Sequence, residues 1–136
     1  LNAYYRECAH QLPEEDAFWQ ALAAAEVEHA RALSTLLTLA EEGKFSIREN
    51  AIHRGTFEAF NQYVSEQIRM ISRGGLSLSV LLSIALDIEL TTLEQDSLSY
   101  YAGDTPELAQ IRATLQEETR QHIAMIRAKL EAVSKR

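Results

Sequence analysis

Five ionisable side chains stand at positions where a helix would be expected to carry apolar residues. Glu26 and His29 are three residues apart, Glu89 stands alone, and Glu118 and His122 are four residues apart. Spacings of three and four place side chains on one face of an α-helix. Buried carboxylates and imidazoles are costly unless something pairs with them, and in helical bundles the usual partner is a metal ion. Carboxylate with imidazole suits iron or manganese, so this pattern predicts a metal site for one of these ions.

The apolar residues around these five positions predict the helices that hold them. Apolar side chains recur in steps of three and four, which is the period of one helix face. The stripe over 18–40 includes His29 and has Glu26 at its edge, the stripe over 78–93 includes Glu89, and the stripe over 108–133 includes Glu118 and His122. We therefore expect three different helices to supply the ligands.

Start and stop signals divide the chain into helical segments. Pro13 follows the first segment, Gly43 ends the second, the pair Gly74-Gly75 ends the third, and the run from Gly103 to Pro106 separates the last two. The predicted helices cover 1–11, about 15–42, 56–73, 77–101 and 106–134, with a connection over 44–55. The sequence therefore predicts an all-α protein, and its 136 residues are most simply one domain.

Antiparallel packing of these helices would bring the five side chains to one level. A fold-back about Gly103 places Glu89 opposite a residue near 117, next to Glu118. A fold-back about the turn at 12–13 places Glu26 opposite the first residues of the chain. The helix over 1–11 is much shorter than its neighbour, which leaves half of that neighbour uncovered, so we expect the first helix to be truncated at its N-terminus.

Composition and charge exclude several classes of function. The net charge of −7 disfavours a surface that binds nucleic acid or an anionic membrane. No apolar run reaches the roughly 18 to 20 residues that span a bilayer. The single cysteine, Cys8, excludes an intramolecular disulfide, which fits a cytoplasmic protein. We expect no nucleic-acid partner, no membrane partner and a cytoplasmic location.

The first helix adds one further side chain of interest. Tyr5 lies on an apolar stripe with Leu1, Cys8 and Leu12. A tyrosine in such a stripe usually packs, and we assign Tyr5 to packing, although its position could point the ring toward the site.

With these residues in place, the chain resembles the rubrerythrin group of the ferritin-like superfamily. The resemblance covers essentially the whole chain and rests on short motifs: Tyr5–Ala9, Phe18-Trp19, Glu26–Ala30, Ala85–Glu89 and Glu118–His122. It implies a ferritin-like four-helix bundle with a long crossover, containing an extra helix, between its second and third helices. It also implies a homodimer and a site for two iron ions, with manganese as an alternative. Members of the group oxidise ferrous iron and reduce peroxide or dioxygen.

Carried over residue by residue, the resemblance implies most of the ligand set. Glu26 and His29 match the ligand pair of the second bundle helix, Glu89 matches the glutamate of the third, and His122 matches the histidine of the fourth. Two departures concern the remaining ligands. The fourth helix of the family carries glutamate three residues before its histidine, where this chain has Thr119, and Glu118 one residue earlier is our substitute. The first-helix glutamate of the family would fall just ahead of Leu1.

The cysteine-rich rubredoxin module of full rubrerythrins is absent from this sequence, so electrons would come from a separate donor protein.

Two other interpretations of the chain remain open at this point. Thr119 and the missing first-helix glutamate favour a degenerate ferritin-like module with a structural or interaction role and no active metal site. A third interpretation is iron handling in an assembly well beyond a dimer.

Overall fold

The computed structural model describes residues 1–43, 46–47, 51–95, 101–102 and 105–136. The described part of the chain is almost entirely helical, as the periodicity predicts. It contains five α-helices, one short 3-10 turn and two strands of two residues each. Their order is α1 (Asn2–Gln11), η1 (Pro13–Glu15), α2 (Asp16–Glu41), β1 (Ser46–Ile47), α3 (Ala51–Ile71), α4 (Leu78–Gln95), β2 (Tyr101–Ala102) and α5 (Pro106–Ser134).

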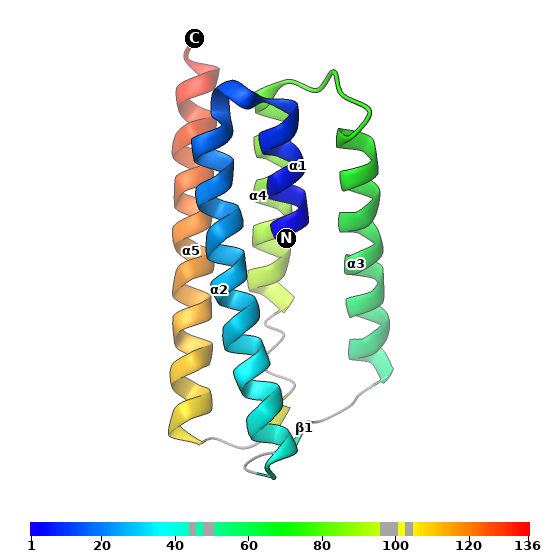
Figure 1. The fold of residues 1–136 in the computed structure, drawn as a ribbon, viewed down its shortest axis with the longest axis vertical. Helices are drawn as coiled ribbons and strands as arrows, with labels where there is room; N and C mark the ends of the chain where they lie inside the picture. The colour runs from blue at the N-terminus through cyan, green and yellow to red at the C-terminus, as the bar shows by residue number, and fades with distance from the viewer. Residues whose placement is uncertain (44–45, 48–50, 96–100, 103–104) are drawn as a thin grey trace.

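The helices run side by side along the long axis of the molecule (Figure 1). Helix α1 packs against α2, α4 packs against α5, and α2 also contacts α5. Helix α3 contacts α1 and α4. Helix α5, which carries Glu118 and His122, therefore lies beside both α2 and α4, which carry the other predicted ligands.

Two boundaries differ from the sequence-based prediction. The helix expected to reach Tyr101 is wrong at its end, because Tyr101 pairs with Ile47 and Ala102 pairs with Ser46 in an antiparallel ladder. Helix α3 begins at Ala51 instead of Thr56, since Gly55 is tolerated inside the helix and no proline interrupts this stretch.

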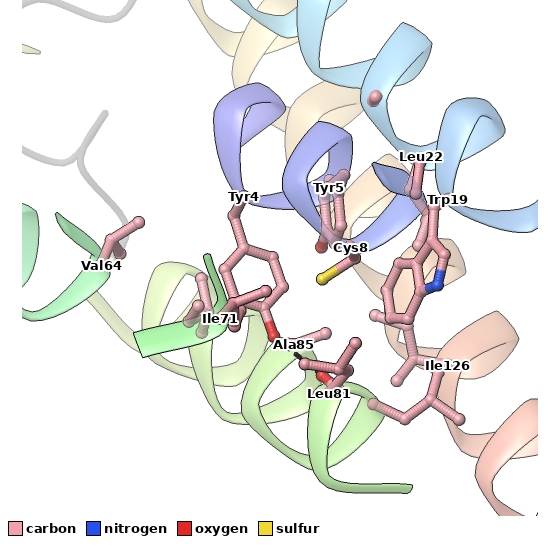
Figure 2. Close-up of a cluster of buried hydrophobic side chains, with 14 residues drawn as sticks. Tyr4, Tyr5, Cys8, Trp19, Leu22, Val64, Ile71, Leu81, Ala85 and Ile126 are labelled. Atoms are coloured by element: carbon pink, nitrogen blue, oxygen red, sulfur yellow. Dashed lines mark hydrogen bonds between the residues drawn. The ribbon is translucent and has the colours of Figure 1, made fainter. Parts of the chain in front are cut away.

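The core is built from all five helices. Its fully buried side chains include Tyr4 and Tyr5 from α1, Trp19 and Leu22 from α2, Ile71 from α3, Leu81 and Leu82 from α4, and Ile126 from α5. Figure 2 labels all of these side chains except Leu82 and shows them converging from the separate helices. Each large apolar side chain of this kind contributes about 1.5–3 kcal/mol by leaving water.

Polar contacts fix the position of α1 along its neighbours. The Tyr4 hydroxyl donates to the carbonyl of Leu81 in α4 at 2.8 Å (Figure 2). Asn2 Nδ2 donates to the carbonyl of Ala23 in α2, also at 2.8 Å. Ala23 lies one helical turn before Glu26, so the start of α1 reaches the level of the predicted site.

In the described ranges, no helix has both the length and the apolar character that crossing a bilayer requires.

Candidate metal centre

Three of the predicted ligands meet in the interior between α2, α4 and α5. Glu26, Glu89 and His122 each offer a ligand atom, and these atoms all lie within 4.8 Å of one another. His122 Nδ1 is 3.1 Å from Glu89 Oε1 and 3.5 Å from Glu26 Oε1. The side chain of Glu89 is only 1% exposed, a degree of burial that a carboxylate rarely reaches unless it is paired. We call Glu26, Glu89 and His122 the buried triad.

The other two predicted ligands adjoin the buried triad on the side of α2 and α5. His29 Nδ1 lies 3.4 Å from Glu26 Oε1, and His29 Nε2 lies 2.8 Å from Glu118 Oε2. The imidazole rings of His29 and His122 stack with their centroids 5.3 Å apart. The Glu118 side chain is 42% exposed, so this pair forms the side of the site that faces solvent.

The position that departs from the family motif is turned away from this cluster. Thr119 is buried, but its hydroxyl donates to the carbonyl of Leu115 in its own helix at 2.9 Å. Glu118 reaches His29 instead, from the spacing of four residues before His122. Glu118 therefore contacts His29 and lies outside the buried triad.

The residues of α4 and α5 that lie opposite each other differ by a few positions from the prediction. Glu89 contacts His122, whereas a fold-back about Gly103 would place it opposite a residue near 117. The midpoint between 89 and 122 falls at Thr105–Pro106, where Thr105 caps α5 and proline occupies its first turn. The start of α5 therefore sets the register of the two helices.

A sixth side chain, Tyr5 of α1, joins the site. Its hydroxyl donates a hydrogen bond to Glu89 Oε1. The assignment of Tyr5 to packing alone is therefore incomplete. One feature of the sequence could have indicated this role. Tyr5 lies on the apolar stripe of the first helix, and the antiparallel fold-back brings the start of that helix close to Glu26.

Burial and charge act in opposite directions on the ionisable groups of the site. Burial by itself would raise the pKa of Glu26, but the contacts with His122 and His29 outweigh it and lower the pKa to about 2. Burial would likewise lower the pKa of His122, but Glu26 and Glu89 outweigh it and raise the pKa to about 9. The contact with Glu26 also raises the pKa of His29. At neutral pH, the metal-free site therefore holds a proton on His122 between two carboxylates.

Two buried atoms of the site fit a metal better than they fit the metal-free network. Within the described residues, Glu26 Oε1 and His29 Nε2 are buried and have no hydrogen-bond partner of acceptable geometry, despite their close neighbours. A buried polar atom left in this way costs about 1–3 kcal/mol. A carboxylate oxygen and an imidazole nitrogen are both donors that iron and manganese accept. The residues present therefore fit a transition-metal ion.

Comparison of the chain with family models, with curated proteins and with solved structures gives no match.

Proposed function

We propose that this protein holds two iron ions in a carboxylate–histidine site and oxidises ferrous iron with reduction of peroxide or dioxygen. The observation that carries this proposal is the convergence of Glu26, Glu89 and His122 from three helices, with ligand atoms within 4.8 Å. Helical bundles build di-metal sites from such inward-facing glutamates and Glu–His pairs. The proposal places the chain with the rubrerythrin-like members of the ferritin-like superfamily.

The ligand set divides into an inner and an outer position. One ion would be held by Glu26, Glu89 and His122, and the second by His29 and Glu118, with Glu26 lying between both. Glu26 Oε1 is close to both histidines, at 3.4 Å from His29 Nδ1 and 3.5 Å from His122 Nδ1, so Glu26 is within reach of both groups of residues. When bound by these residues, iron would supply the redox chemistry of the site.

The surrounding residues would exclude water and manage the proton. The inner position is lined by α4, whose Ala85 and Ile88 are fully buried, and Glu89 is nearly so. Binding of a metal requires His122 to be neutral, so the proton that it shares with Glu26 and Glu89 must leave. Glu118, on the exposed side, is the ligand that solvent and incoming ferrous iron reach first.

The helix arrangement supports the finer features of this assignment. Helices α1, α2, α4 and α5 would form the four-helix bundle, and α3 would be the extra helix in the crossover between α2 and α4. We also propose that the oxidant is a small molecule, that a separate protein returns electrons, and that the protein is a cytoplasmic homodimer. Manganese is an alternative to iron, since the ligands suit both ions.

One observation favours the second candidate, a degenerate module with a structural role. The three carboxylates and two histidines already contact one another, and the buried proton on His122 balances part of their charge. The hydroxyl of Thr119 is satisfied within its own helix. Such a network can persist as a structural element without a metal, and metal binding separates the two candidates.

Removing the outer ligand tests the proposed division. We expect anaerobic titration with ferrous iron to give two bound ions per chain, and Glu118→Ala to bind one. Glu118 is partly exposed, so the substitution should change stability by no more than about 0.5 kcal/mol. Glu117→Ala is the matched control, because Glu117 is exposed on the same helix and contacts Arg120 at 3.7 Å, and it should bind two ions.

The outcome that contradicts the proposal is equally direct. If the protein binds no more iron than scattered surface carboxylates would, the result would support the degenerate module with a structural role. Two bound ions in Glu118→Ala would remove Glu118 from the ligand set.

A further inference from the structure

The faces of α2 and α3 that contact α1 continue past the N-terminal end of α1. In α2, the carbonyl of Ala23 accepts a hydrogen bond from Asn2, in the first turn of α1. In α3, Val64 lies in the same buried cluster as Tyr4 of α1. Figure 1 shows both α2 and α3 extending well beyond the N-terminal end of α1. Along this extension, α1 no longer covers the two faces.

Apolar side chains on both faces become exposed beyond the end of α1. On α2, Ala23 is 2% exposed, whereas Leu37, about four turns further along the same face, is 49% exposed. Val27, which follows Ala23 by about one turn, is 40% exposed. On α3, Val64 is 9% exposed, whereas Phe57, about two turns earlier on the same face, is 47% exposed. We call Val27, Leu37 and Phe57 the open face.

We propose that the open face binds an amphipathic helix of a partner protein, with lysine or arginine beside its apolar stripe. The open face continues the surface on which α1 packs against α2 and α3, so a helix already fills the same position one step along the molecule. An amphipathic helix that lays its apolar side on such a surface is a recurring mode of recognition between proteins. This proposal goes beyond the proposed function and does not depend on it.

The charges beside the open face favour a basic partner. Glu58 directly follows Phe57, Glu41 ends α2 about one turn after Leu37, and both glutamates are exposed. Arg31 is the only lysine or arginine of α2, and it pairs with Glu28. Opposite charges across an interface speed the encounter and disfavour wrong partners. A second copy of this chain, with its net charge of −7, would bring like charge to this face.

The test measures binding of a synthetic helix to the full chain by fluorescence anisotropy. From Val27 to the end of α2 is roughly 21 Å, so the probe is a fluorescein-labelled peptide of about 15 residues with a leucine stripe flanked by lysine. A second peptide replaces each leucine with serine and keeps the charge, and a third replaces each lysine with glutamate and keeps the stripe. We expect saturable binding of the first peptide and at least about tenfold weaker binding of the other two.

Variants of the chain locate the binding. Leu37→Asp and Phe57→Asp should each weaken binding about tenfold or more, because each places a carboxylate against the apolar stripe. Val80→Asp is the matched control, since Val80 of α4 is 41% exposed and lies outside the open face, and its affinity should stay within about twofold. Circular dichroism checks that each variant is folded.

Three results would overturn the proposal. The first is no saturable binding, or equal binding of the serine or glutamate peptide. The second is a loss of affinity in Val80→Asp as large as in Leu37→Asp. The third is light scattering that shows a dimer of the unsubstituted chain and a monomer of Leu37→Asp, because a second copy would then cover the open face.

Discussion

Replacing Glu89 with leucine is expected to abolish iron binding at the buried triad and to lower the free energy of unfolding of the metal-free protein by about 3 kcal/mol. Glu89 is the acceptor for both the Tyr5 hydroxyl and His122 Nδ1. Leucine would leave a buried phenol without a partner and would remove one of the two carboxylates beside His122. A degenerate module in which Glu89 had no partner would gain stability on this change, whereas these two contacts predict a loss.

Glu89→Gln is the matched control for this prediction. Glutamine keeps an oxygen that can accept from Tyr5 and His122 but removes the negative charge, so the unfolding free energy should fall by only about 1 kcal/mol. Iron binding should still be lost, because a neutral amide is a weak ligand for these ions. Chemical denaturation measures the stability and anaerobic titration measures the binding. A leucine variant more stable than the unsubstituted protein would contradict the contacts assigned to Glu89.

Affinity for the ion held by Glu26, Glu89 and His122 is expected to rise about tenfold per pH unit between about pH 7 and pH 9, because that ion displaces the proton of His122. The contacts with Glu26 and Glu89 raise the pKa of His122 to about 9, so this ring carries a proton throughout that range. The pKa of Glu26 is about 2, so its carboxylate is ionised at every pH in the range and adds nothing to the slope. Calorimetry with manganese in buffers of different ionisation enthalpy would count the released protons.

The metal-free protein should respond to pH in the opposite direction. The pKa of His122 is higher in the folded chain than its ordinary value of 6.5, so its contribution to stability is fully present below pH 6.5 and is lost as pH rises through about 9. Stability without metal should therefore fall over the range in which metal affinity rises. Metal affinity that does not change with pH would contradict a protonated His122 in the metal-free site.

Most of the helical fold was predictable because its signals are local. The period of the apolar residues, a stop signal such as Gly43 and a start signal such as Pro106 locate the helices to within a few residues. The pairing of Ser46–Ile47 with Tyr101–Ala102 was not predictable, because two-residue strands carry no pattern and depend on a contact between distant segments. The same pairing explains why the helix expected to reach Tyr101 does not do so.

The sequence could predict which residues form the site, but not which of them contact each other. Ionisable side chains in apolar stripes identified Glu26, Glu89 and His122, and the structure brings them together. The pattern could not show that Glu118 contacts His29, since that depends on how α2 and α5 are rotated. It also could not separate Tyr5 from an ordinary core tyrosine, because the distinction lies in its acceptor and not in its spacing.

Anomalous X-ray diffraction from crystals grown anaerobically with ferrous iron tests the central claim most directly. We expect one strong peak between Glu26, Glu89 and His122, and a second beside His29 and Glu118. Iron peaks only at surface carboxylates, or none within coordination distance of the buried triad, would contradict the claim.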